Sequence, residues 1–354
     1  DFLPPFYFTY WIIILAIVAI PHEFAHGIFA RLNRIRIHST GFGFLGTFLA
    51  AFVEPDEKQM EEAKKFPQLS ILAAGTFANV VFTIIFALLF WLFFATAFTP
   101  AGAVFNTYAA DLVPISSIDS INGVQIIDLN QIPSLINESS EFAEIKIQNT
   151  TFFVNPAQLI FAVESNIQEI PAVFNSPAFR ARLSGAIIEI NGVQIKTFED
   201  LSSELQKHSP GDKVTIKTIQ EDKEIKEYEI ELAEHDGKTF LGIGIIPQQS
   251  RGLIGSVYNI ITEIKDPFTY YESSIGNLGI FIYHLLWWCV LISISVALVN
   301  MLPLGIFDGG RFFYLTIWGI TGSQAIGQKA FKASTWLLLF LIIALMVKWV
   351  FAFV

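Results

Sequence analysis

Residues 6–30 read FYFTYWIIILAIVAIPHEFAHGIFA, an almost continuously apolar run whose second half contains two histidines and a glutamate. A helix that crosses a bilayer needs about 20 mostly apolar residues, so this run predicts a membrane span. Its segment His22-Glu23-Phe24-Ala25-His26 matches the pattern H-E-x-x-H. Residues four apart share one face of a helix, so His22 and His26 can both present ring nitrogens to one zinc ion. Glu23 follows His22 directly and is placed to act as a general base.

Ionisable side chains are scarce in this chain, so the cluster of three at residues 22–26 is unusual. Only 15% of the 354 residues are charged and 53% are hydrophobic, against about 25% charged residues in ordinary soluble proteins. On insertion scales, each ionisable group within a span costs about 2.5–3.5 kcal/mol. The cluster therefore favours a functional site over the alternative, a polar helix end that reaches water beside Arg31.

Three further apolar runs are long enough to span a membrane, at residues 69–98, 278–302 and 336–354. The sequence thus predicts an α-helical polytopic membrane protein with about four core spans. Because the chain begins at Asp1 without a methionine, we expect a fragment or a processed form with segments missing before Asp1. Cys289 is the single cysteine, which excludes an internal disulfide framework.

A soluble insert separates the second span from the third. Residues 111–247 carry 21 acidic and 10 basic side chains, a net charge of −11, whereas the rest of the chain carries 11 acidic and 12 basic, a net of +1. This acidic balance disfavours nucleic acid as a partner.

Basic residues gather in the loop after the first span and in the loop before the last span, whereas the flanks of the insert are poor in them. Because cytoplasmic loops are rich in Lys and Arg, this pattern predicts that the insert lies on the side opposite the cytoplasm. We expect a multi-pass protein in the cell membrane of a prokaryote. The basic loop residues are Arg31, Arg34, Arg36, Lys58, Lys64, Lys65, Arg311, Lys329 and Lys332.

The sequence Ile-Asn-Gly-Val-Gln-Ile occurs twice in the insert, at residues 121–126 and 190–195. In both copies Asn-Gly lies between apolar strand-like runs and predicts a tight turn. The flanks of the second copy resemble PDZ domains of bacterial membrane proteases, and residues 241–245 (LGIGI) resemble their carboxylate-binding loop. We therefore predict an α+β insert with two PDZ-like modules, which would bind peptide C-termini by strand addition. The alternative is one intact module with an irregular insertion.

The predicted organisation is a first membrane half at residues 1–100, a degenerate PDZ-like module at 101–175, a second PDZ-like module at 176–250 and a second membrane half at 251–354.

Zinc needs a third protein ligand, for which the sequence offers two carboxylates. Glu54 follows a glycine-rich stretch rather than lying on a helix. Asp308 ends a long apolar run in residues 300–310, NMLPLGIFDGG, where Pro303 and Gly305 would break the helix and turn the carboxylate inward. The predicted topology places Asp308 and His22 at a similar depth, near the cytoplasmic ends of their spans, so Asp308 is the better candidate.

H-E-x-x-H in a first span and N-x-x-P-x(4)-D-G after a later span resemble the site-2 protease family of intramembrane zinc metalloproteases, over essentially the whole chain. The resemblance implies Zn²⁺ held by His22, His26 and Asp308, with Glu23 as general base. It also places Asn300 near the substrate, where the amide would stabilise an oxyanion or hold the substrate backbone.

Two other stretches resemble elements of this family. Residues 41–46 (GFGFLG) resemble a membrane-embedded β-hairpin that pairs with an unwound substrate; its candidate substrate-binding residues are Gly41, Phe42, Gly43 and Phe44. Residues 74–79 (AGTFAN) resemble a Gly-Pro-x-x-Asn element, but Thr76 replaces the proline. For Asn79 we therefore favour a helix-packing face. Structural roles are predicted for the remaining histidines and the cysteine: His38, His208, His235, His284 and Cys289.

The resemblance implies regulated intramembrane proteolysis: hydrolysis of peptide bonds in or near the transmembrane segments of membrane-anchored proteins, regulators of transcription among them. The PDZ-like region would gate or bind these substrates. Two alternatives stay open. One is a catalytically silent zinc-containing scaffold that binds partners through its PDZ modules. The other is a transporter whose polar cluster lines an ion path.

Overall fold

The computed structural model describes residues 8–45, 48–137, 139–246, 262 and 264–351. The described residues form two compact units: Asp1–Ala97 with Ser273–Val354, and Phe98–Glu272. The first unit contains the predicted spans and the second is the predicted insert.

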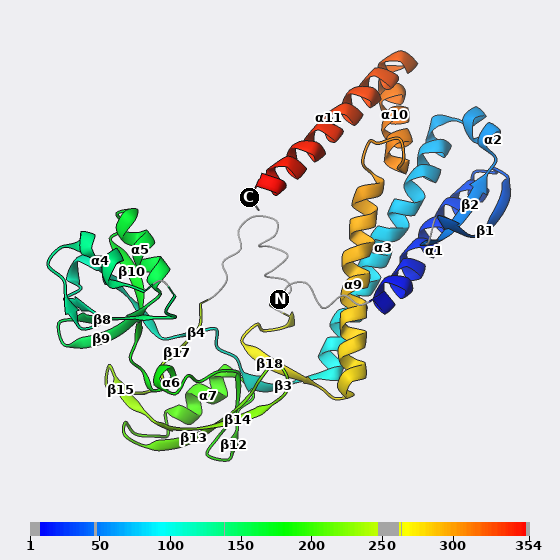
Figure 1. The fold of residues 1–354 in the computed structure, drawn as a ribbon. Coiled ribbons are helices and arrows are strands. Elements are labelled where there is room, and N and C mark those ends of the chain that lie inside the picture. Colours follow the sequence, from blue (N-terminus) through cyan, green and yellow to red (C-terminus); the bar gives the residue numbers. More distant parts are fainter. Residues whose placement is uncertain (1–7, 46–47, 138, 247–261, 263, 352–354) are drawn as a thin grey trace. The chain divides into compact units, whose positions relative to one another are not determined.

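Four of the described helices are long and apolar enough to cross a membrane, as predicted. A helix satisfies its backbone hydrogen bonds internally, which is why such apolar runs can lie in lipid as helices. Helices α1, α3 and α9 pack side by side, and α11 packs against the shorter α10 (Figure 1). The helix bounds are α1 (Phe8–Leu32), α2 (Glu57–Glu62), α3 (Lys65–Ala97), α9 (Gly276–Asn300), α10 (Asp308–Thr321) and α11 (Gln324–Phe351).

The first helices pack through apolar side chains spaced by one helical turn. Tyr10, Ile14 and Val18 follow one face of α1 and pack against Phe86 of α3 and Cys289 of α9. This face continues one turn further to His22, so the packing aligns α1 with its two neighbours at the level of the H-E-x-x-H segment. Cys289 is buried in this cluster, as expected for a packing residue.

The glycine-rich stretch after α1 forms a β-hairpin. Strands β1 (Ile37–Leu45) and β2 (Phe48–Pro55) are antiparallel, with Gly41 opposite Phe52 and Gly43 opposite Ala50. The inner strand β2 packs along α1, so β1 is the outer strand. Residues 46 and 47, at its turn, lie outside the described residues.

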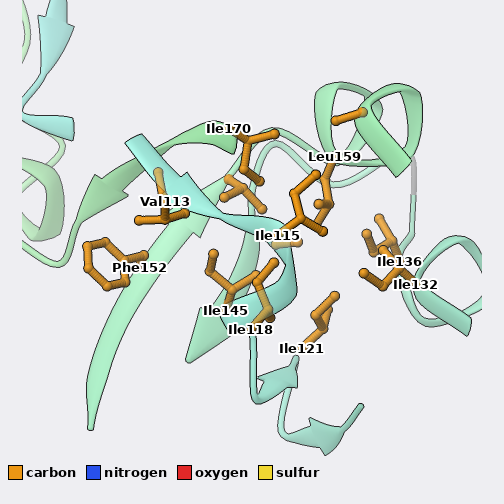
Figure 2. Close-up of a cluster of buried hydrophobic side chains, with 14 residues drawn as sticks. Val113, Ile115, Ile118, Ile121, Ile132, Ile136, Ile145, Phe152, Leu159 and Ile170 are labelled. Carbon is orange, nitrogen blue, oxygen red and sulfur yellow. The ribbon is translucent and has the colours of Figure 1, made fainter. Parts of the chain in front are cut away.

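In the described part of the insert, the first sheet has six strands in the order β5-β10-β9-β8-β6-β7. Leu159 of α5 and Ile132 of α4 close its core, which contains Ile121 and Ile145 from the sheet (Figure 2). The elements are β5 (Ala110–Pro114), η1 (Ile115–Ser117), β6 (Ser120–Ile121), β7 (Val124–Gln125), η2 (Leu129–Gln131), α4 (Ile132–Leu135), β8 (Ala143–Ile147), β9 (Thr150–Val154), α5 (Pro156–Glu164) and β10 (Glu169–Phe174).

The second sheet has the order β14-β13-β11-β3-β18, with β12 paired to β11. Leu201 of α7 covers its core. The elements are β3 (Phe98–Ala103), α6 (Pro177–Arg180), β11 (Ala186–Ile190), β12 (Val193–Gln194), α7 (Phe198–Leu205), β13 (Lys213–Ile219), β14 (Ile225–Glu231) and β18 (Thr269–Ser273), with the short pairs β4 (Thr107–Tyr108)–β17 (Ile243–Gly244) and β15 (Ala233–His235)–β16 (Lys238–Phe240).

The two copies of the six-residue repeat adopt the same local structure. Each forms a tight hairpin, β6–β7 in the first copy and β11–β12 in the second, with positive φ at both Asn and Gly. The turn asparagines also make equivalent bonds: Asn122 Oδ1 accepts from Glu144 N, and Asn191 Oδ1 accepts from Thr215 N. The sequence repeat therefore corresponds to a repeat in local structure.

The chain does not complete one sheet before it begins the other. Strand β3 pairs with β11, and β4 pairs with β17, although β3 and β4 both precede the whole first sheet. Residues 110–174 are thus an insertion within the second sheet's segment, whereas the predicted boundaries assigned residues 101–109 to the first module. Backbone pairing between segments distant in sequence produces this arrangement. Local sequence patterns therefore could not predict it.

Candidate metal centre

The two histidines of α1 direct the same ring atom toward one point. Nε2 of His22 and Nε2 of His26 lie 3.3 Å apart. The predicted i, i+4 spacing on a helix produces this proximity, because both side chains leave the same face.

Asp308 reaches these histidines through a reversal of the chain. Helix α9 ends at Asn300, the segment with Pro303 and Gly305 turns, and α10 begins at Asp308. Gly309 permits the reversal, because a Cβ there would collide with the backbone of Met301. The carboxylate Oδ2 of Asp308 lies 3.5 Å from Nε2 of His22 and 3.2 Å from Nε2 of His26.

The three ligand atoms have the separations that a tetrahedral ion requires. Zinc holds nitrogen and oxygen ligands at about 2.0–2.1 Å, which separates ligand atoms of a tetrahedral site by about 3.3–3.4 Å. The observed separations of 3.2, 3.3 and 3.5 Å fit this geometry. His22, His26 and Asp308 could therefore hold a metal ion, and a fourth position would stay open for water or substrate.

The backbone of α3 orients His26. The Nδ1 of His26 lies 2.7 Å from the carbonyl oxygen of Ile71. A carbonyl only accepts, so Nδ1 carries the ring proton and Nε2 keeps its lone pair for a metal. This outer hydrogen bond is typical of histidines that bind metals.

The outer ring nitrogen of His22 also has its partner on α3. The amide nitrogen of Asn79 lies 3.0 Å from Nδ1 of His22, and Asn79 is only 1% exposed. Gly75 lies between the two contacts, and a Cβ there would collide with both imidazole rings. Ile71, Gly75 and Asn79 thus form one face of α3, at positions i, i+4 and i+8, that borders both histidines.

This arrangement differs from the helix-packing role predicted for Asn79. The sequence carried a signal of this face, a glycine followed by an asparagine four residues later. It did not indicate which element the face would meet, since α3 and α1 are paired only by tertiary packing.

Two predicted catalytic residues lie beside the ligands. The amide nitrogen of Asn300, the last residue of α9, is 3.2 Å from Nε2 of His22. Glu23 is half-buried on α1 and follows His22 in sequence. The structure thus brings the Asn300 amide to the edge of the three-atom cluster and leaves Glu23 on α1 next to His22.

Other candidates lie apart from the metal ligands. The Glu54 carboxylate accepts a hydrogen bond from the Ser39 hydroxyl at 2.6 Å within the hairpin, and the group of possible metal ligands contains Asp308 in its place. His38 pairs instead with Asp56 at 3.3 Å, near the base of the hairpin. The glycine-rich residues 41–44 lie on β1, separate from the ligand cluster.

A groove of about 470 Å³ runs between α1 and the hairpin. It reaches Phe24, the neighbour of Glu23, and its lining is apolar except for Arg31 and Thr40. The lining residues are Phe24, Gly27, Ile28, Arg31, Leu32, Ile37, Thr40 and Val53.

Two relatives bear the name zinc metalloprotease RasP. The protein from Shouchella clausii (strain KSM-K16) is 26% identical over 187 residues, which cover 44% of this chain and 44% of that protein. The protein from Geobacillus kaustophilus (strain HTA426) is 25% identical over 189 residues, again 44% of each. The chain therefore aligns with less than half the length of these relatives.

The sequence model of Peptidase family M50 matches residues 10–345, a range that includes α1, α3, α9 and Asp308. Because this match extends over nearly the whole chain, the protein belongs to Peptidase family M50, the site-2 protease family that its motifs predicted.

Proposed function

We propose that this protein is a zinc-dependent endopeptidase that hydrolyses peptide bonds in or near the transmembrane segments of membrane-anchored proteins. The observation that carries the proposal is the convergence of His22 Nε2, His26 Nε2 and Asp308 Oδ2 at separations of 3.2–3.5 Å. Family membership and the zinc metalloprotease name of two relatives support it. When bound, zinc would act as a Lewis acid that polarises the scissile carbonyl.

Two residues of this chain serve the remaining chemistry. The Glu23 carboxylate takes a proton from the attacking water and returns it to the departing amine. The Asn300 amide donates a hydrogen bond to the oxygen of the scissile carbonyl as negative charge develops there. Its position at the end of α9, 3.2 Å from a ligand nitrogen, supports this role.

The substrate backbone is extended at the hairpin before cleavage. A helix hides its carbonyls in internal hydrogen bonds, so a transmembrane substrate must unwind locally. The outer strand β1 offers an edge for pairing at residues 41–44, and Phe42 is 62% exposed there. Strand addition at this edge holds the unwound segment, with main-chain hydrogen bonds replacing those the helix loses.

The insert selects or admits substrates. Its second module carries the features that suggested a PDZ domain: helix α7, the strand pair β13–β14 and the glycine-rich segment at β17. Peptide C-termini would bind there by strand addition. The basic loops orient the metal site toward the cytoplasm and the insert toward the opposite side of a prokaryotic cell membrane. Regulators of transcription that are anchored in the membrane fit this topology as substrates.

A Glu23→Gln variant tests the activity. Glutamine keeps the size of the side chain but cannot take the proton, so cleavage of a single-span substrate co-reconstituted in liposomes should fall by at least about 100-fold. Zinc content, measured by elemental analysis, should stay at the wild-type value because Glu23 is not a ligand.

A Glu54→Gln variant is the matched control, since Glu54 bonds Ser39 in the hairpin rather than bordering the metal site. It should cleave at the wild-type rate. Full activity of Glu23→Gln would exclude the mechanism. Zinc binding by the wild type with no cleavage of any single-span substrate would favour the silent scaffold.

A further inference from the structure

His22 is in contact with two amide groups, one on each side of its ring. The amide nitrogen of Asn79 lies 3.0 Å from Nδ1, and the amide nitrogen of Asn300 lies 3.2 Å from Nε2. A neutral imidazole has a single acceptor nitrogen and a single N–H donor. His22 can therefore accept a hydrogen bond from at most one of the two amides, and the N–H on its other ring nitrogen needs an acceptor.

The buried polar atoms indicate which amide accepts. The Oδ1 atom of Asn79 is buried and has no hydrogen-bond partner among the described residues. A buried acceptor without a partner is unfavourable by about 1–3 kcal/mol. Rotating the Asn79 amide by 180° exchanges its nitrogen and oxygen, and then Oδ1 accepts the proton of His22 Nδ1–H.

This rotation also suits the other edge of the ring. Nε2 is the atom that faces Asp308 and His26, so a metal ion would bind there through its lone pair. The ring proton must then lie on Nδ1, where the only neighbour suited to accept it in the described part of the chain is Asn79. The Ile71 carbonyl has the corresponding role toward His26.

We propose that Asn79 is a positioning residue for the metal site: its side-chain oxygen accepts the Nδ1 proton of His22 and so holds this ligand with Nε2 directed at the metal. The inference rests on the proposed function, because it concerns zinc binding. Asn79 acts through His22 and touches neither metal nor substrate.

Zinc affinity is the direct test, measured on the full chain in detergent by competition with a chromogenic chelator. Loss of an outer-shell partner typically weakens metal affinity by about 10–100-fold. Asn79→Leu, which removes both polar atoms at similar volume, should therefore raise the zinc Kd by this factor. Asn79→Asp, whose carboxylate only accepts, should bind zinc at least as tightly as the wild type.

Thr83→Val is the matched control. Thr83 lies one turn beyond Asn79 on α3, and its half-buried hydroxyl donates to the Asn79 backbone carbonyl, so the variant loses a hydroxyl next to Asn79 without touching His22. Its zinc Kd should equal that of the wild type. Thermal unfolding of each apo variant shows whether the fold persists.

A second readout reports the ligand set itself. Co²⁺ in place of zinc should give the visible absorption of a tetrahedral site in the wild type and in Asn79→Asp, and an altered spectrum in Asn79→Leu. Unchanged zinc Kd and Co²⁺ spectrum in Asn79→Leu would overturn the inference while leaving the proposed function intact. Equal weakening in Asn79→Asp and Asn79→Leu would also overturn it, because the amide nitrogen would then be the required group. A wild-type chain that binds no zinc would refute both proposals.

Discussion

At the scale of single residues, the candidate metal site depends on its polar side chains and on the absence of a side chain at Gly75. His22 and His26 differ in the partner of the outer ring nitrogen: a backbone carbonyl for His26 and the Asn79 amide for His22. Both partners come from α3, which can approach the rings because Gly75 has no Cβ. The residue that makes this close approach possible contributes no atom to the ligand set.

Replacing Gly75 with alanine should separate metal binding from stability. In an ordinary helix interior this change stabilises by about 0.5–1 kcal/mol. Here the added methyl would displace both imidazoles, so we expect zinc affinity to fall by about tenfold or more, while thermal unfolding of the apo protein changes little. Chelator competition and calorimetry measure the two quantities.

The neighbouring Thr76→Ala variant is the control, since it changes α3 at the next position and removes a hydroxyl that has no partner in the described structure. Its zinc affinity should stay unchanged. Wild-type zinc affinity in Gly75→Ala would show that α3 does not constrain the histidines as the structure indicates.

At the scale of elements, the hairpin differs from the helices in having an open edge. Strand β2 is occupied on both sides, by α1 and by β1, whereas β1 is the outer strand. A strand with unpaired backbone groups is suited to adding another chain. The groove between α1 and the hairpin borders this region and provides apolar surface beside it.

Phe42→Ala should weaken substrate binding without affecting chemistry. An aromatic side chain contributes about 150–250 Å² of contact area, so its loss should raise KM for a membrane substrate several-fold and leave kcat and zinc content nearly unchanged. Cleavage kinetics in liposomes of varied substrate density measure this.

Phe77→Ala is the matched control, because Phe77 of α3 is exposed to nearly the same fraction, 60% against 62% for Phe42. Its KM should equal the wild-type value. An equal rise of KM in both variants would mean that Phe42 acts as general apolar surface and not as part of a substrate site.

At the scale of the whole molecule, charge and apolar surface are divided between the two units. The membrane unit exposes large apolar side chains along its helices, as on α11, whereas the insert encloses two separate hydrophobic clusters. Each cluster is built from residues of the insert alone. The insert therefore has what an independently folding domain requires.

The segment 98–272, expressed alone, should fold as a soluble β-rich protein with an unfolding free energy of about 5–15 kcal/mol. Leu159→Ala and Leu201→Ala, in the first and second clusters, should each destabilise it by about 2–5 kcal/mol. Circular dichroism with chemical denaturation measures both effects. A fragment without cooperative unfolding would show that the insert depends on the membrane unit.

Much of this protein follows from the sequence because the controlling patterns are local. Spans of about 20 apolar residues must be helices in lipid, and the H-E-x-x-H spacing places two histidines on one helical face. Asn-Gly at residues 122–123 and 191–192 requires backbone conformations that few other pairs adopt, so both hairpins were predictable. Asp308 could be predicted as the third ligand because a carboxylate at the end of a long apolar run is unusual in a membrane protein and indicates a functional role.

Contacts between distant segments required the three-dimensional structure. The contact between Asn79 and His22 depends on α3 packing against α1, and the pairing of β3 with β11 joins strands on either side of a whole intervening sheet. Such contacts depend on the packing of many side chains from different segments, so no single stretch of sequence predicts them. The amino-acid sequence determines which atoms can bind a metal, and the packing of α1, α3 and the α9–α10 turn brings them within 3.2–3.5 Å of one another.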